Sequence, residues 1–293
     1  MFFHTVFKMT PQRVKAILGA MSQRAPWLDK YHNGRTVTDW DGLRDAVSRT
    51  PSRNTREILG KSEKVDKGKA LKVHTRVVYL APGSLSGINV CPWSSPGCVA
   101  SCLKLHGRMN MGIQTRAQLE KTWWFLLFPQ HFLTQLSKEL RSHEERCKRS
   151  GMVCAVRING TSDIPWERTG LLERHEGVTF YDYTKAPLKS RRTADNYSLT
   201  FSVSEKRGSL ANARKYVERG HNAAVVVGDD KRTKTGAKRV QAEILERGEL
   251  FGSSVVNGDA TDVRFLDPRG TFVVLHAKGK AAKDTTGFVK RFA

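Results

Sequence analysis

The sequence has no apolar run of the roughly 18 to 20 residues that a helix needs to span a bilayer. Its start, MFFHTVFKMTPQRVK, lacks the sustained apolar stretch and small-residue cleavage site of a secretory signal. The G-x-S-x-G, Walker A and H-E-x-x-H motifs are also missing, so hydrolase, nucleoside triphosphatase and zinc-protease functions have no motif support. We therefore expect a cytoplasmic protein with no membrane partner.

Acidic residues are scarce relative to basic ones. Lys and Arg number 50 against 28 Asp and Glu, which gives a net charge of +22 and a pI near 10.1. Such an excess is typical of proteins that meet phosphate backbones, although a solubilising surface or attraction to anionic lipid is an alternative. The excess extends along the whole chain rather than forming a basic tail. Nucleic acid is therefore the expected partner.

The 293 residues are enough for one large α/β domain with an appendage. Residues 1–70 are polar and basic, with helical periodicity at 11–21 and 40–47, and we predict a basic, partly helical N-terminal extension. In residues 71–293, short apolar runs alternate with helical patterns. This alternation indicates a mostly parallel sheet and predicts a full or partial (β/α) barrel that forms the catalytic domain.

The predicted elements of this domain follow from apolar periodicity. Strands are predicted at 73–80, 153–158, 178–181, 198–203, 223–227 and 271–275, with shorter candidates at 254–256 and 263–266. Helices are predicted at 115–128, 129–149, 209–219 and 237–247.

Only five cysteines occur, and three of them fall within the segment GINVCPWSSPGCVASCLKLHGR with the spacing C-x6-C-x3-C. Cys98 and Cys102 would share a helix face, and the Pro and Gly residues would let Cys91 fold back toward them. In a reducing compartment this clustering favours a metal site over disulfides, with buried or free thiols as the alternative. Cys147 and Cys154 are interpreted as core residues.

The number of thiols bears on the identity of the metal. Three thiolates leave one iron of a [4Fe-4S] cluster open, which suits S-adenosylmethionine, whereas structural zinc prefers four ligands. His106 lies four residues after Cys102 and would complete a Cys3His zinc site. The sequence therefore permits an iron–sulfur cluster with S-adenosylmethionine or, alternatively, zinc.

Polar residues follow most of the predicted strands, where the carboxyl ends of a parallel sheet assemble a site. The segments are RINGTSDIPWE, FYDYTK and LTFSVSEK. We expect cofactor binding by Asn159, Thr161, Ser162, Ser202 and Ser204. Catalytic roles are expected for Asp163, Asp182, Lys185 and Glu205. The alternatives are an Asx-type turn in which Asp163 caps the next helix, and core packing of the tyrosines.

Three basic runs lie after strands or in connecting loops, where they would surround the mouth of a barrel with positive charge. The alternative is that they are solvated loops with no common face. The residues expected to contact nucleic acid are Arg191, Arg192, Lys231, Arg232, Lys234, Lys238, Arg239, Lys278 and Lys280.

The chain resembles the bacteriophage gene-product-88 family over roughly residues 58–293. The matching stretches are YLAPGSLSGINVCPWSSPGCVASCLKLHGR, RINGTSDIPWE, FYDYTK, NYSLTFSVSE, NGDATDVRFLDP and LHAKGKAAKDTTGFV. This resemblance implies a protein of the host cytoplasm, but names no reaction.

The arrangement is also similar to radical S-adenosylmethionine enzymes, in which a three-cysteine loop follows the first barrel strand, usually as C-x3-C-x2-C. That resemblance implies a cluster held by Cys91, Cys98 and Cys102 and base modification of nucleic acid or a nucleotide. A second resemblance, to queuine tRNA-guanine transglycosylases, implies zinc-dependent exchange of a DNA base. A non-enzymatic protein that binds nucleic acid or a host factor, with a structural zinc, is a further alternative.

Overall fold

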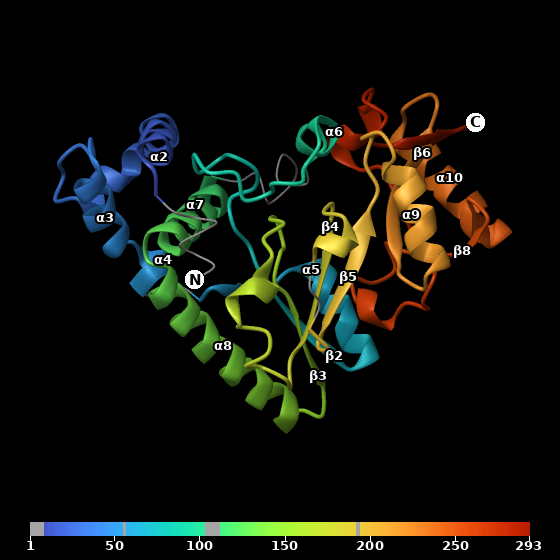
Figure 1. Ribbon diagram of the computed structural model, residues 1–293, viewed down its shortest axis with the longest axis horizontal. Coiled ribbons are helices and arrows are strands. Elements are labelled where there is room, and N and C mark those ends of the chain that lie inside the picture. The colour runs from blue at the N-terminus through green and yellow to red at the C-terminus, as the bar shows by residue number, and fades with distance from the viewer. Residues whose placement is uncertain (1–8, 55–56, 103–111, 192–193) are drawn as a thin grey trace.

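The computed structural model describes residues 9–54, 57–102, 112–191 and 194–293, apart from the side chains of residues 52 and 54. A ten-stranded sheet forms its centre, in the order β1-β2-β3-β4-β5-β6-β9-β8-β7, with β10 paired to β6 (Figure 1). The strands are β1 (Leu59–Gly60), β2 (Val73–Val78), β3 (Val153–Arg157), β4 (Thr179–Thr184), β5 (Tyr197–Ser202), β6 (Ala223–Asp229), β7 (Glu249–Leu250), β8 (Ser253–Asn257), β9 (Phe272–His276) and β10 (Lys290–Phe292).

The pairing in the sheet is parallel from β2 through β6 to β9 and β8. The antiparallel pairs β1·β2 and β7·β8 lie at its two edges. Because β2 to β6 follow one another in chain order, right-handed crossovers keep their connections on one face, as in a barrel and unlike a doubly wound sheet. The sheet is not closed among the described residues, so a full barrel is not shown. The architecture is mixed α/β with an open sheet.

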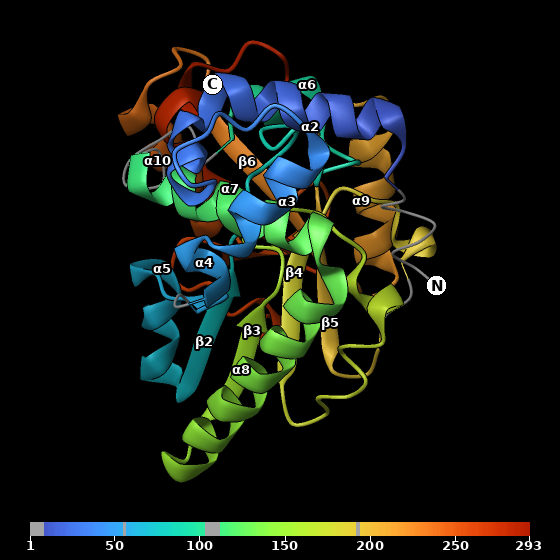
Figure 2. The same cartoon turned by 90° about the vertical axis from the view of Figure 1, so that its left-hand side faces the viewer.

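The helices cover the sheet in two groups. Figure 2 shows α8 (Pro129–Arg149) in front of β3 and β4, with α7 (Gly112–Leu127) above these strands and packed against α8. Further along the sheet, α9 (Ser209–Glu218) contacts β5 and β6, and α10 (Lys234–Arg247) contacts β6 and β9. None of the described helices is long and apolar enough to cross a bilayer.

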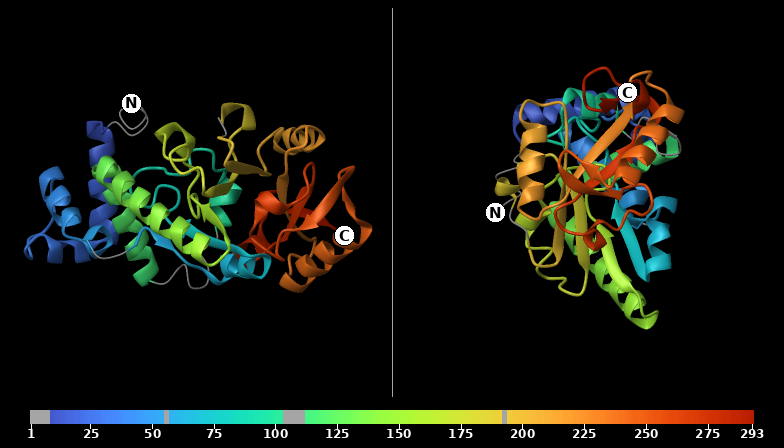
Figure 3. Two further views of the ribbon diagram at one scale, coloured as in Figure 1. Left: turned by 90° about the horizontal axis from the view of Figure 1, so that it is seen from below. Right: turned by 90° about the vertical axis from the view of Figure 1, so that its right-hand side faces the viewer.

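The N-terminal segment contains α2 (Pro11–Arg24), η1 (Pro26–Tyr31), α3 (Trp40–Ser48), α4 (Pro51–Asn54), α5 (Glu63–Asp66) and η2 (Lys67–Leu71). Helices α2 and α3 lie at the opposite end of the molecule from the C-terminus (Figure 3). Side chains on both sides of the predicted boundary at residue 70, such as Leu43 and Trp123, share one hydrophobic core. The extension is therefore packed onto the domain.

The predicted strands and helices are confirmed with shifts of a few residues at their ends, apart from 263–266. That segment contains the 3-10 helix η7 (Arg264–Leu266). Val263 and Phe265 pack against Val73 and Tyr181 on the inner face of the sheet, which explains the apolar alternation. The segment closes its own hydrogen bonds at short range, such as Leu266 N–H to the Val263 carbonyl, so it joins no strand. The prediction of a strand there was wrong.

Candidate functional site

A cavity of about 290 Å³ lies beyond the carboxyl ends of the parallel strands. Side chains from five neighbouring strands line it, which shows that the sheet curves around it. These are Arg157 (β3), Tyr183 (β4), Ser202 (β5), Val226 (β6) and Leu275 (β9). The volume is near the lower end of the range for small-molecule sites.

All three clustered cysteines line this cavity. Cys91 lies in the loop after β2, where the Gly83 N–H donates to its Sγ at 3.4 Å and its thiol donates to the Thr161 carbonyl at 3.5 Å. The loop is also joined to the segment after β3 by the Asp163 N–H, which donates to the Val90 carbonyl at 2.9 Å. Burial raises the pKa of the Cys91 thiol to about 12, so this thiol is protonated at neutral pH unless a cation binds it.

Cys98 is carried by the short helix α6 (Pro96–Ala100). Ser95 caps it by accepting from the Cys98 N–H at 3.2 Å. Because α6 ends at Ala100, Cys102 lies beyond its C-cap, and the expectation that Cys98 and Cys102 share a helix face was wrong. The loop nevertheless brings both to the same cavity.

Glu205 holds α6 in place from the loop after β5. Its carboxylate accepts from the Ser95 hydroxyl and from the Gly97 N–H, both at 2.7 Å. Gly97 is also pressed against the C-terminal segment beside α6, since a Cβ there would lie 2.2 Å from the Thr286 Oγ1 (Figure 1). Glu205 was expected to be catalytic, but it does not line the cavity and its carboxylate instead contacts the cysteine loop.

The spacing of the three thiols bears on which metal they fit. Among the described His, Cys, Asp and Glu residues, one group of three has its potential ligand atoms within 4.8 Å of one another. That group lies elsewhere in the fold. The three cavity thiols are not such a group, so at least one pair of their sulfurs is more than 4.8 Å apart and would have to approach for all three to bind one zinc ion. His106, the alternative zinc ligand, lies outside the described residues.

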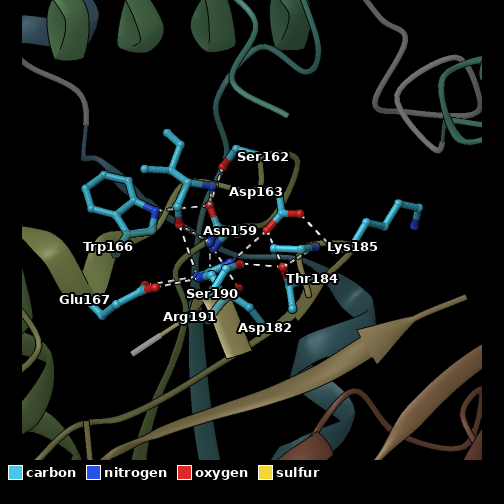
Figure 4. A network of polar contacts seen from close by, with 12 residues as sticks. Asn159, Ser162, Asp163, Trp166, Glu167, Asp182, Thr184, Lys185, Ser190 and Arg191 are labelled. Atoms are coloured by element: carbon cyan, nitrogen blue, oxygen red, sulfur yellow. Dashed lines mark hydrogen bonds and ion pairs between the residues drawn. The ribbon is translucent and has the colours of Figure 1, made fainter. Parts of the chain in front are cut away.

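The turn after β3 is held by a buried network of polar contacts (Figure 4). The Asn159 Oδ1 accepts from the Ser162 hydroxyl at 2.7 Å, from the Ile164 N–H at 2.9 Å and from the Trp166 Nε1–H at 3.1 Å. Its amide nitrogen donates to the Ile164 carbonyl and to Asp182. Asn159 lines the cavity, but its side-chain hydrogen-bonding capacity is used by the turn and by Asp182 on β4.

Asp182 lies beneath this turn rather than in the cavity, which corrects its expected place in the site. It accepts from the Asn159 N–H at 2.7 Å and from the Tyr197 hydroxyl at 2.8 Å. Burial raises the pKa of its carboxyl to about 7. The strand prediction ended at residue 181, whereas β4 continues to Thr184, so Asp182 faces the helix-covered side.

Asp163 and Arg191 form the centre of a buried ion-pair network. The Asp163 carboxylate accepts from the Thr184 hydroxyl at 2.8 Å, the Lys185 N–H at 2.9 Å and the Arg191 guanidinium at 3.0 Å. Arg191 also pairs with Glu167 at 2.6 Å, and its side chain is 2% exposed. Asp163 lines the cavity, and it does not cap the following 3-10 helix η5 (Trp166–Thr169), as the alternative interpretation had it. Arg191 was expected to contact nucleic acid, but it is buried in this network and paired with two carboxylates.

The other predicted residues divide into two groups. Thr161, Ser162, Lys185, Ser202 and Lys278 line the cavity, and the Lys185 ammonium donates to the Ser202 hydroxyl at 2.7 Å. Ser204 is buried outside the lining, where its N–H donates to the Ser209 hydroxyl, so its expected cofactor contact is corrected. Arg192 lies outside the described residues. The remaining basic residues, Lys231, Arg232, Lys234, Lys238, Arg239 and Lys280, are exposed.

Sequence reasoning missed two groups of charged residues at the cavity. In the first, the fully buried Asp262 pairs with Lys64 at 2.7 Å and with Arg157 at 3.0 Å. Burial disfavours its charge, but the two cations outweigh burial and lower the pKa of Asp262 to about 2. One signal of this group was visible in the sequence. Arg157 occupies the final position of β3, and an arginine there needs a buried acid as its partner.

The second group contains His276, at the end of β9, and Asp259. The His276 Nδ1 lies 2.7 Å from the Asp259 Oδ2 and 3.1 Å from the Gln241 Oε1. Both neighbours accept, so Nδ1 carries the hydrogen and the neutral ring keeps a lone pair on Nε2. Lys278 also pairs with Asp259. The rule that site residues follow strand ends could have found both Asp259 and His276.

The family model of gene product 88 matches residues 48–291, which include all the residues described at this cavity. No curated protein and no solved structure matches the chain, so the likeness to radical S-adenosylmethionine enzymes and to transglycosylases gains no support from these comparisons. The family resemblance seen in the sequence motifs is confirmed over most of the chain, and the chain belongs to the bacteriophage gene product 88 family.

Proposed function

We propose that this protein is a metal-dependent enzyme that uses S-adenosylmethionine to modify nucleic acid or a nucleotide. The observation that carries the proposal is the shared cavity, in which Cys91, Cys98 and Cys102 meet polar side chains from the ends of several strands. Structural cysteines seldom gather around a cavity with charged groups, whereas catalytic metal sites are built this way.

The residues present fit a [4Fe-4S] cluster better than a single zinc ion. Three thiols leave one iron of such a cluster without a cysteine ligand, and at least one pair of their sulfurs is more than 4.8 Å apart, wider than in a tetrahedral zinc site. When bound, such a cluster supplies an electron to S-adenosylmethionine at its open iron. Cys91, Cys98 and Cys102 are the ligands in this proposal.

Beside the cysteines, the chain offers groups to bind and orient a cofactor and substrate. Lys185 and Lys278 place ammonium groups at the cavity, where they can pair with a carboxylate or phosphate, and Ser202 adds a hydroxyl. His276, oriented by Asp259, presents Nε2 to accept a proton from a bound substrate. Asn159, Asp182 and Glu205 act as positioning residues.

The direct test uses protein reconstituted anaerobically with iron and sulfide. We expect the reduced protein to release methionine from S-adenosylmethionine, and single-stranded DNA or RNA to raise the rate. A Lys185→Met variant should weaken S-adenosylmethionine or substrate binding while the iron content is unchanged. Intact S-adenosylmethionine under every condition, despite full iron loading, would overturn the cofactor assignment.

Nucleic-acid binding is proposed from charge and position. Lys231, Lys234 and Lys238 are exposed in or just after the loop that follows β6, at the same edge of the sheet as the cavity. Binding that neutralises phosphates releases counterions, so affinity should fall steeply with salt. Replacing these three lysines by glutamine is expected to lower affinity for single strands and to reduce the slope of log K against log salt by about 0.7 per lost phosphate contact.

The matched control removes the same charge elsewhere. Lys138, Arg141 and Arg149 are exposed on α8, away from the cavity. Replacing them by glutamine should leave the salt slope nearly unchanged in fluorescence anisotropy titrations of single-stranded DNA and RNA. Equal slopes for both triple variants would contradict the proposed binding surface. Charge-driven binding is strongest at low salt concentration. Undetectable binding at about 50 mM salt would therefore overturn the nucleic-acid assignment.

A further inference from the structure

A second group of potential metal ligands lies at the opposite end of the strands from the cavity. His74 on β2 and Cys154 on β3 are paired in the parallel register, so their side chains point to the same face of the sheet. Helix α8 covers this face and presents His143 and Cys147 one turn apart. Four residues of two chemically suitable types therefore converge from three elements.

The distances are those of a metal site rather than of a loose cluster. The ligand atoms of His74, His143 and Cys147 all lie within 4.8 Å of one another. The Cys147 Sγ is 3.7 Å from the His143 Nδ1. In tetrahedral zinc sites, zinc–sulfur distances of about 2.3 Å and zinc–nitrogen distances of about 2.0 Å separate these atoms by about 3.5 Å.

The hydrogen bonds of His143 orient its ring for ligation. Its Nε2 lies 3.0 Å from the His74 carbonyl and 3.3 Å from the Ala155 carbonyl, and both can only accept. Nε2 therefore carries the hydrogen, and the lone pair of the neutral ring is on Nδ1, the nitrogen nearer to Cys147. Metal-bound histidines are typically held in this way by a backbone carbonyl on the other nitrogen.

We propose that His74, His143 and Cys147 bind a structural zinc ion, and that Cys154, whose thiol contacts that of Cys147 but lies outside the group of three, moves in as the fourth ligand when the ion binds. The Cys2His2 set matches the closed four-ligand sites that zinc occupies in structural roles. His143, Cys147 and Cys154 are buried, and His74 is partly exposed, which leaves a path for the ion to enter. The ion ties α8 to β2 and β3, at a distance from the proposed cluster.

The test measures zinc in the full-length protein purified without added metal. We expect one zinc per chain in the wild type and also in a Cys91→Ser, Cys98→Ser, Cys102→Ser triple variant. Cys147→Ser should lower the zinc content at least tenfold. Zinc that disappears in the triple variant and persists in Cys147→Ser would assign the ion to the cavity and overturn this proposal.

A second measurement does not depend on the stability of a core variant. Cobalt added to the metal-free triple variant should give the visible absorption of tetrahedral coordination and a thiolate charge-transfer band. His74→Ala changes the partly exposed ligand and should shift these bands while the far-ultraviolet circular dichroism stays the same. A spectrum without the thiolate band, or a Cys147–Cys154 disulfide found by mass spectrometry, would also overturn the proposal.

Discussion

Replacing Cys98 by serine is expected to abolish iron loading at the cavity. Cys98 is fixed there by α6, which Ser95 and Glu205 anchor, and no other described cysteine apart from Cys91 and Cys102 lines the cavity. With two thiolates left, a [4Fe-4S] cluster loses one of its three protein ligands, and serine is a poor substitute for the softer sulfur. Iron and sulfide per chain should fall to background, and the visible absorption of the reconstituted protein should disappear.

The matched control is Cys154→Ser, which alters a cysteine outside the cavity. This variant should keep its iron and lose the zinc proposed for the second site, whereas Cys98→Ser should keep that zinc. The two variants thus separate the two metals in the same preparation. Full iron loading in Cys98→Ser, or zinc bound by the cavity cysteines of the wild type, would contradict the cluster and favour a structural zinc in this loop.

Cys98→Ser also separates chemistry from binding. The exposed lysines that we expect to contact phosphate lie on other segments of the chain. Nonspecific affinity for DNA and RNA should therefore remain close to that of the wild type, while release of methionine from S-adenosylmethionine stops. A parallel loss of affinity would indicate that the cysteine loop itself supports the nucleic-acid surface.

The strands could be predicted because buried parallel strands form apolar runs, and the site followed from them. Polar residues just past the strand ends, such as Thr161, Ser162 and Ser202, do line one cavity. The same rule placed Cys91 correctly, since the loop after β2 folds over the strand ends. These residues share one property, namely that their position depends mainly on local chain geometry and strand direction.

The residues that were misplaced depend on contacts over long sequence distances. Glu205 anchors Gly97 across 108 positions, and Arg157 meets Asp262 across 105. No periodicity in the sequence reveals such pairs. Asp182 was misplaced by a smaller effect, because an error of a few residues at the end of a strand changes which face a side chain occupies.

The cysteines of α8 and β3 show a further limit. Cys147 and Cys154 were interpreted as core residues, and both are indeed buried. Burial is compatible with ligation, however, and the spacing of His143 and Cys147 on one helix face was visible in the sequence. What the sequence did not reveal is that His74 and Cys154 are partners in the sheet.

Replacing Arg191 by methionine is expected to lower the free energy of unfolding by about 3 to 5 kcal/mol, the usual cost of breaking a buried ion pair from one side. Methionine preserves much of the volume but leaves Glu167, whose side chain is 1% exposed, and Asp163 without their cation. Hydrogen bonds to Thr184 and Tyr197 are lost as well. Urea denaturation followed by circular dichroism measures the difference.

Two further variants identify the cause. Arg191→Lys should recover only part of the stability, because an ammonium cannot reproduce the two guanidinium bonds to Glu167 at 2.6 and 3.0 Å. Arg239→Met breaks an exposed pair with Glu243, one helical turn away on α10, and should cost only about 0.3 to 0.5 kcal/mol. A similar small cost for Arg191→Met would contradict the buried network.

Arg191→Met also decides between a structural and a nucleic-acid role for the basic run that contains it. A buried arginine cannot exchange its carboxylate partners for phosphate without unfolding its surroundings. The folded variant should therefore bind DNA and RNA with the wild-type salt slope, in contrast to the variant lacking Lys231, Lys234 and Lys238. A reduced slope in Arg191→Met, measured well below its unfolding midpoint, would mean that this side chain reaches phosphate after all.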